Sequence, residues 1–178
     1  MKRVMILLAV VVAAPLQSQA PKAYAKFSPV ASSRAAWEDA VGNIAKAAEQ
    51  VTEANYAYKP TPTVRSFGQL IGHVAGAQHL YCGAVLGEKT GNEDDVEKTA
   101  TTKAALVAAL KASNDHCRKA YAVLDADASK MVTVFGQDES VLTALIGNAM
   151  HDQEHYGIIV TYMRMLGMVP PSSQPRTP

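Results

Sequence analysis

The sequence predicts an all-α four-helix bundle, and three observations lead to this fold class. Four long stretches repeat apolar residues at steps of three and four, which places them on one face of a helix. Proline-containing or polar connections separate these stretches, and runs rich in β-forming residues are few. At 178 residues with 48% hydrophobic content, the chain can bury one core, so its length favours a single domain.

The first helix is expected over residues 33–53. Its apolar positions recur at alternating steps of four and three between Trp37 and Val51. Pro60 and Pro62 follow in the sequence. Because a proline disfavours helix at the residue before it, two prolines spaced two apart indicate an extended connection.

The second helix is expected from Phe67 to about Leu86. Ser66, with Gln69 three residues on, has the form of a capping box, which marks a helix start. The polar connection that follows, residues 87–100, can span roughly 45 Å, more than the roughly 30 Å of a 20-residue helix. This long crossover loop can return the chain to the end from which the second helix started. The second and third helices would then be parallel.

The third helix is expected to begin after candidate caps at Thr101 and Thr102. Its apolar positions include Leu106 and Leu110, and the pattern continues to Leu124. A second connection then separates it from the last helix.

The fourth helix is expected from about Glu139 to near Gly167, because glycine is favoured just after a helix end. The connection before it contains a short extended piece at residues 131–135. Residues 170–178 begin with two prolines and have the composition of a Pro/Ser tail. The bundle itself is therefore expected over residues 26–169.

The two cysteines test the parallel arrangement. Cys82 lies 16 residues after the cap at Ser66, and Cys117 lies 15 residues after the cap at Thr102. Parallel helices place both at the same height, whereas antiparallel helices would separate them by roughly 15 Å along the axis, too far for a disulfide. We expect a Cys82–Cys117 disulfide, and the alternative is two buried free thiols.

The N-terminus has the features of a secretory signal over residues 1–20. Lys2 and Arg3 form a positive head, residues 4–14 are an unbroken apolar run, and small residues stand at the cleavage site. A cut after Ala25 is the alternative. Since the apolar run is too short to span a bilayer, we expect an exported protein, periplasmic or extracellular, with no membrane attachment after cleavage.

The charge balance argues against a nucleic-acid partner. Removing Lys2 and Arg3 with the signal leaves 15 basic and 16 acidic side chains, a formal charge of −1. This balance offers no electrostatic footprint for nucleic acid or an anionic membrane. The longest charged cluster, residues 88–98, has mixed sign and is interpreted as a solvated loop. The expected partner is an unknown small molecule.

A pair of histidines four residues apart, His151 and His155, lies in the fourth predicted helix. Four residues turn an α-helix by about 40°, so both imidazoles leave one face about one turn apart and can bind one metal ion. His73, near the apolar seam of the second helix, is the natural third ligand. His79 lies about 240° around that helix from His73, and His116 stands in a polar run, so both are placed outside this site.

Glycines accompany the three candidate ligands. Gly72 and Gly76 lie close to His73, and Gly147 precedes His151 by one turn. Glycine costs a helix interior about 1 kcal/mol relative to alanine, so its presence needs a reason. Two interpretations remain open, which are room for a ligand beside the metal and close packing of the helix.

Residues 151–155 also fit H-x-x-E-H, the signature of inverted zinc peptidases in which the glutamate is the general base. Those enzymes take a third, acidic ligand from well downstream. Residues 156–178 contain no Asp or Glu, so the assignment fails. Heme is equally unsupported, because the sequence has no C-x-x-C-H motif.

Several segments together carry a family resemblance. They are residues 59–68, His73, residues 151–157, residues 162–164, Gly167 and residues 169–173. With these segments the sequence resembles the DinB-like (DinB/YfiT) family of metalloenzymes over essentially the whole mature chain. The resemblance implies an up-down-down-up bundle and a metal on one histidine of the second helix and two of the fourth, which map onto His73, His151 and His155. It also implies zinc or nickel as the metal and homodimers as a common assembly.

The chemistry implied by the resemblance is less definite. Some relatives are thiol-cofactor transferases or isomerases that use the metal to lower a thiol's pKa in the cytosol, a thiol pool that an exported protein reaches poorly. Three neutral nitrogens leave a metal with an open position, which activates a bound water or thiol. Glu154 and Asp152 are the candidate bases or outer-shell groups.

Three hypotheses follow for the function. The first is an exported metal-dependent hydrolase or transferase, the second a non-catalytic metal-binding or stress-related bundle, and the third a plain bundle whose histidines are satisfied in the core. Metal content separates the first two from the third, and activity separates the first from the second.

Overall fold

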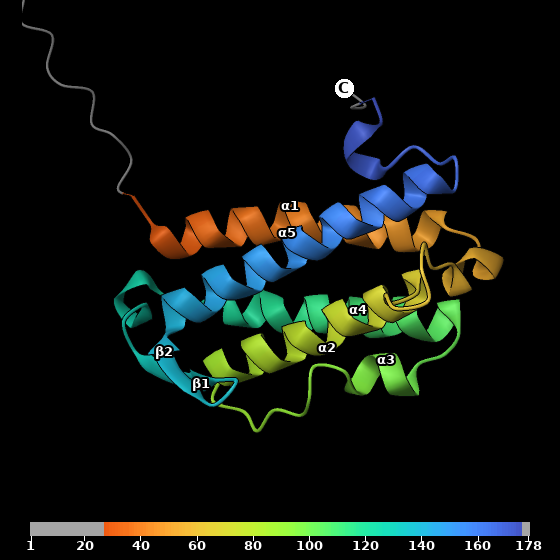
Figure 1. The fold of residues 1–178 in the computed structure, drawn as a ribbon. Coiled ribbons are helices and arrows are strands. Elements are labelled where there is room, and N and C mark those ends of the chain that lie inside the picture. The colour runs from red at the N-terminus through yellow and green to blue at the C-terminus, as the bar shows by residue number, and fades with distance from the viewer. Residues whose placement is uncertain (1–26, 176–178) are drawn as a thin grey trace, which may run out of the picture.

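The computed structural model describes residues 27–175 as a helical bundle with a short hairpin at one end (Figure 1). Its α-helices are α1 (Pro29–Gln50), α2 (Phe67–Val85), α3 (Asp95–Thr99), α4 (Lys103–Ala120) and α5 (Val141–Met165). Strands β1 (Met131–Val134) and β2 (Gln137–Ser140) pair antiparallel, and 3₁₀ turns cover Glu53–Ala57, Asp125–Asp127 and Pro171–Ser173. The predicted all-α bundle is confirmed, with α1, α2, α4 and α5 as its four long helices.

Helices α2 and α4 run parallel, as the crossover predicted. Gln78 Nε2 donates to Asn114 Oδ1 at 3.0 Å, and further along both helices Cys82 and Cys117 form a disulfide with their Cα atoms 5.2 Å apart. Residue numbers therefore rise together on the two helices. The expected disulfide is present, and its two half-cystines are fully buried.

The outer helices run against this central pair. Tyr162, near the end of α5, donates its hydroxyl to the carbonyl oxygen of Arg65, just before α2, at 2.9 Å. Lys103, at the start of α4, donates from Nζ to the carbonyl oxygen of Glu49, at the end of α1, at 2.7 Å. The order is thus up-down-down-up.

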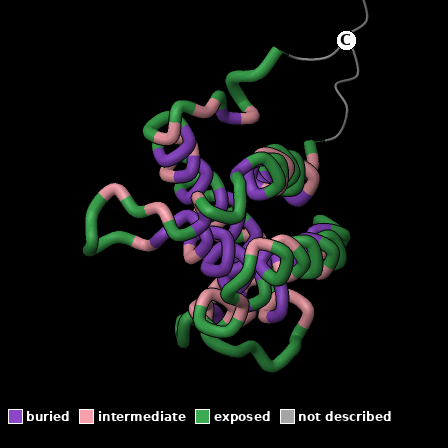
Figure 2. The backbone as a smooth tube through the Cα atoms, turned by 90° about the vertical axis from the view of Figure 1, so that its right-hand side faces the viewer, coloured by how far each residue is buried: buried purple, intermediate pink, exposed green. Residues whose placement is uncertain are grey.

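The buried residues of the four long helices lie towards the middle of the bundle (Figure 2). Near the disulfide, the Trp37 ring stacks on Tyr121 with centroids 4.6 Å apart, a contact that contributes about 0.5–1.5 kcal/mol beyond the area it buries. The Tyr121 hydroxyl donates to the carbonyl oxygen of Leu145 at 2.7 Å. This hydrogen bond connects the end of α4 with α5.

Helix α1 begins four residues earlier than predicted. Ser28 is its N-cap and accepts a hydrogen bond from the Ala31 amide at 3.0 Å, while Pro29 occupies the first turn. Proline suits this position, because the amide it lacks would have no partner there anyway. The predicted start at residue 33 was four residues too late because the first turn, which Pro29 opens, carries little apolar pattern.

The long connections contain two elements whose partners the sequence did not show. The crossover includes the short helix α3, and the predicted extended piece is β1, paired in a hairpin with β2. Phe135 and Gly136 make the hairpin turn with φ of 50° and 75°. Because β2 takes residues up to Ser140, α5 begins at Val141 instead of Glu139.

Of the C-terminal ends predicted for α4 and α5, one is wrong and one is correct. Helix α4 ends at Ala120, short of the predicted Leu124, and Tyr121 turns into the core. Helix α5 ends as predicted beside Gly167, which has φ of 73° and lets the Met168 amide donate to the Met163 carbonyl oxygen at 2.8 Å.

The segment predicted as a tail is attached to the bundle as far as the structure describes it. The Tyr156 hydroxyl donates to Ser172 Oγ at 2.8 Å, and Gln174 Nε2 donates to Gln50 Oε1 at 2.9 Å. The predicted signal, with its cut after residue 20 or 25, lies outside the described residues. Within residues 27–175 no helix combines the length and apolar character needed to cross a bilayer.

Candidate metal centre

Three imidazoles meet between α2 and α5. His73 comes from the middle of α2, and His151 and His155 come from successive turns of α5. The Nε2 atoms of His73 and His155 each lie 3.1 Å from His151 Nε2. The structure thus brings together the three residues that the sequence nominated as metal ligands.

The geometry fits one transition-metal ion. Nitrogens bound about 2.0–2.1 Å from one ion, at angles between octahedral and tetrahedral, lie roughly 2.8–3.4 Å apart. The two spacings to His151 Nε2 in the triad of His73, His151 and His155 fall in this range, and ligand nitrogens of all three residues lie within 4.8 Å of one another, close enough to share an ion. His73 and His155 are buried and His151 is half-buried, so little water competes for the lone pairs.

An acidic pair from the crossover lies behind His73. Asp94 Oδ1 lies 3.1 Å from His73 Nδ1, and Glu97 Oε2 lies 4.0 Å from the same atom. A carboxylate beside Nδ1 holds the ring proton there and leaves the Nε2 lone pair for a metal. Arg65 binds both acids, through Nη2 to Asp94 at 2.9 Å and Nε to Glu97 at 2.7 Å.

The acidic pair was not predicted from the sequence. Residues 88–98 were expected to form a solvated loop, yet the Glu97 side chain is only 11% exposed and Asp94 faces the triad. The signal that could have indicated it is the spacing of Asp94 and Glu97, which α3 places on one face. Nothing in the sequence showed that this face would turn towards α2.

The glycines serve packing. A Cβ on Gly76 would overlap the Glu93 carbonyl oxygen, and one on Gly72 would lie 2.6 Å from the Glu97 Cα. The crossover backbone therefore lies directly on α2, which brings Asp94 to His73. On α5, a Cβ on Gly147 would lie 3.2 Å from the Tyr81 ring. Of the two interpretations, close packing is correct and room for a ligand is wrong.

The two candidate bases lie in different places. Asp152 is fully buried, with Oδ1 3.6 Å from His151 Nδ1, and neither carboxylate oxygen has a hydrogen-bond partner among the described residues. Burial raises the pKa of Asp152 to about 6, and His151 partly opposes this shift. Asp152 thus lies on the far side of His151 from the Nε2 atoms. Glu154 is exposed, and within residues 27–175 no hydrogen bond or ion pair connects it with the triad.

The electrostatic environment favours the neutral forms of His73 and His155. Burial lowers the pKa of His73, with the charge of Arg65 acting in the same direction. Burial also lowers the pKa of His155 to about 3, helped by the neighbouring His151 and His73. Neutral imidazole is the form that binds metal, so these shifts favour binding.

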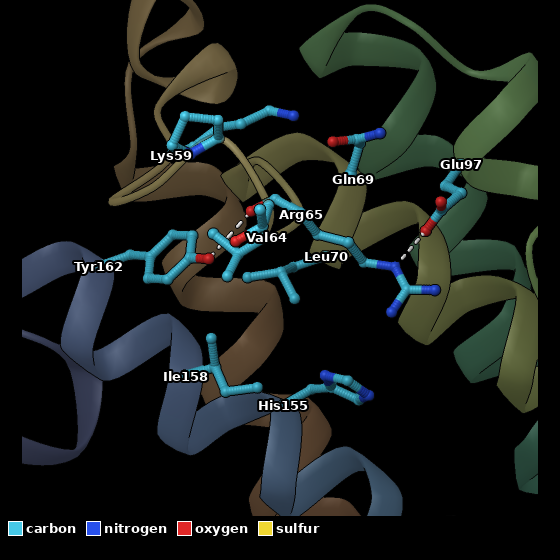
Figure 3. A pocket seen from close by; sticks show the side chains of 11 residues that line it. Lys59, Val64, Arg65, Gln69, Leu70, Glu97, His155, Ile158 and Tyr162 are labelled. Atoms are coloured by element: carbon cyan, nitrogen blue, oxygen red, sulfur yellow. Dashed lines mark hydrogen bonds and ion pairs between the residues drawn. The ribbon is translucent and has the colours of Figure 1, made fainter.

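A pocket opens beside His155 with a volume of about 540 Å³ (Figure 3). Its lining combines polar and apolar side chains from the 59–70 segment, the crossover and α5: Lys59, Pro62, Thr63, Val64, Arg65, Gln69, Leu70, Glu97, His155, Ile158 and Tyr162. Since one candidate ligand forms part of its wall, a small molecule in this pocket would lie next to the triad.

A model of the DinB superfamily matches residues 36–159 of this sequence, which include all three histidines and most of the bundle. The chain belongs to the DinB superfamily. Among curated proteins none is similar enough to match.

Solved structures show the same fold for this DinB chain. A DinB-like protein from Bacillus cereus ATCC 10987 is 17% identical with a TM-score of 0.65, covering 78% of this chain and 93% of its own. A conserved protein from Enterococcus faecalis is 15% identical with a TM-score of 0.64, covering 79% and 99%. A DinB-like protein from Bacillus subtilis is 19% identical with a TM-score of 0.55, covering 82% and 99%.

Proposed function

We propose that this DinB protein is an exported metal-binding protein that holds one divalent transition ion, zinc or nickel, on His73, His151 and His155. The observation that carries the proposal is the approach of the His73 and His155 Nε2 atoms to within 3.1 Å of His151 Nε2, with ligand nitrogens of all three residues within 4.8 Å of one another. Three neutral nitrogens from two helices are a donor set that zinc and nickel both accept.

We further propose that the loaded centre is a metal-dependent hydrolase or transferase. A bound ion with an open position would supply Lewis-acid chemistry to a water, thiol or carbonyl group. The pocket beside His155 supports this, because it offers a binding volume for a small molecule next to the ligands.

The residues of the pocket would divide two tasks. Arg65 forms ion pairs with Asp94 and Glu97, the two acids behind His73. Its charge is therefore not free to bind a substrate. Lys59 lines the same pocket and has no ion-pair partner among the described residues. An anionic or strongly polar group on the small molecule would therefore be held best near Lys59.

A second candidate function is metal binding without catalysis. The observation that favours it is the position of the two candidate bases, since Glu154 is exposed and Asp152 lies on the far side of His151. Neither carboxylate is placed to take a proton from a molecule in the pocket.

Export and homodimer formation belong to the proposal as well. The N-terminal sequence supports export, and the disulfide is compatible with an oxidising compartment. The homodimer is an expectation from the family resemblance alone.

The test has two stages. Purified protein reloaded with zinc or nickel should retain one equivalent at the triad, and His151→Ala should lose it; failure of the parent to take up either ion would refute the site. The loaded parent is then assayed against ester, amide and thiol-transfer substrates beside His151→Ala. Turnover that disappears in the variant supports the enzyme, and metal uptake without turnover supports the non-catalytic bundle.

A further inference from the structure

The remaining two histidines of the chain also form a pair. His79 on α2 and His116 on α4 approach each other with their Nδ1 atoms 3.4 Å apart. The sequence analysis placed both outside the triad, and the structure shows them on the α4 side of α2, where His79 is exposed and the His116 side chain is 17% exposed. No residue of the triad takes part in this contact.

Glu88 favours one tautomer of the His116 ring. Its Oε2 lies 2.8 Å from His116 Nε2, and because an ionised carboxylate only accepts, the ring proton sits on Nε2. The lone pair of His116 is then on Nδ1, which faces His79. This carboxylate–imidazole contact on the side away from the free nitrogen is the outer-shell arrangement found around metal-bound histidines.

The turn after α2 holds Glu88 in this place. Gly87 adopts φ of 72°, and the Glu88 amide donates to the Gly83 carbonyl oxygen at 2.8 Å. A positive φ favours glycine, so the sequence at Gly87 directs the chain back over α2. Glu88 thus reaches His116 from a defined backbone position.

The spacing of the pair is compatible with one shared metal ion. Two nitrogens about 2.0–2.1 Å from a tetrahedral ion lie about 3.3–3.4 Å apart. The observed 3.4 Å falls in this range.

The disulfide holds the two rings in register. His79 is three residues before Cys82, and His116 immediately precedes Cys117. Because the bridge fixes α2 against α4 at this height, the chain does not have to order the helices when a ligand binds.

We propose that His79 and His116 form a second divalent-metal site, with Glu88 as the positioning residue of His116. Two imidazoles and an exposed setting leave the other coordination positions to water. Imidazole ligands suit zinc, nickel and copper, and Cu²⁺ binds tightest among the divalent ions. The site is separate from the triad and does not depend on the function proposed for it.

Zinc titration tests the proposal. The parent protein, disulfide intact, is titrated with zinc chloride by calorimetry beside His79→Ala and His116→Ala, with Lys119→Ala as the control for an exposed α4 substitution. Each histidine variant should lose one binding event of the parent, or weaken it by more than about tenfold, and the control should lose none. Unchanged binding in either histidine variant would overturn the proposal.

A second measurement isolates the pair from the triad. In a His151→Ala/His155→Ala background, one equivalent of Cu²⁺ should give an electron paramagnetic resonance spectrum with coupling to two nitrogens. Adding His79→Ala should remove this coupling, and Glu88→Ala should weaken Cu²⁺ binding about 10–100-fold. A spectrum that is the same with and without His79 would refute the site. Circular dichroism of each variant verifies the helical fold.

Discussion

The two faces of α2 carry histidine clusters that are built in opposite ways. Towards α5, His73 joins a buried triad held by side-chain packing and by acids from the crossover. Towards α4, His79 joins an exposed pair held by a disulfide and one glutamate. The difference teaches that the triad depends on the position of the crossover, whereas the pair depends on the covalent bridge.

Removing the Cys82–Cys117 disulfide should have the largest effect on the free energy of unfolding. Cys82→Ser/Cys117→Ser opens a loop with a sequence separation of 35, which corresponds to about 3–4 kcal/mol of unfolding free energy. Urea denaturation followed by circular dichroism measures the loss. If the His79–His116 pair depends on the disulfide and the triad does not, zinc affinity should fall more at the pair than at the triad. Equal losses at both sites would contradict this difference.

Truncating His151 should abolish tight binding at the triad alone. The loss of one of three ligands should exceed the roughly 10–100-fold that follows loss of an outer-shell partner, so we expect a decrease of more than about 100-fold in zinc affinity. Competition with a chromogenic chelator measures it. The matched control is His79→Ala, which should leave the tight site unchanged.

Replacing Asp94 by Asn should show how far the crossover supports the triad. Without the carboxylate beside His73 Nδ1, zinc affinity should fall by about 10–100-fold while the fold is retained. Glu93→Gln is the control, since it removes a neighbouring acid that makes no hydrogen bond with His73. An equal loss in both variants would mean that only the net charge matters.

Adding a single methyl group at Gly76 should disrupt the contact between the crossover and α2 and lower stability. Gly76→Ala forces Glu93 away from the helix and should cost about 1–3 kcal/mol, because backbone cannot yield as a flexible side chain can. Thermal unfolding measures the change, and zinc affinity at the triad should fall with it as Asp94 moves.

The matched substitution for Gly76→Ala is Gly157→Ala on α5. No neighbouring atom lies within 4 Å of a Cβ at this position, so alanine should raise stability by up to about 1 kcal/mol. Stabilisation by both substitutions would contradict the close packing of the crossover.

The sequence predicted the triad because periodicity carries the needed information. Helical angles placed His151 and His155 on one face and His73 near the apolar seam of its helix, and nearly equal distances from helix caps placed Cys82 beside Cys117. These inferences use only the regular geometry of a helix. The structure therefore agrees with them except for small errors in the helix boundaries.

The rest depended on contacts that no periodic pattern encodes. Asp94 reaches His73 because the crossover backbone fits against glycines of α2, and a mixed-charge segment gives no sign of which face turns inward. His79 and His116 could have been paired from their positions beside the two cysteines. That inference would have used the disulfide to show that residues near Cys82 and Cys117 on the two helices also lie close together.

The disulfide also decides how the chain would respond to cleavage. Residues 83–116 lie between Cys82 and Cys117, so the end of α2, the whole crossover and most of α4 form one closed covalent ring. A protease that cuts the exposed segment near Lys89 would open the ring without releasing a fragment. The nicked protein would run as one species on a gel until reduction, and Asp94 would stay tethered to the helix that carries His73.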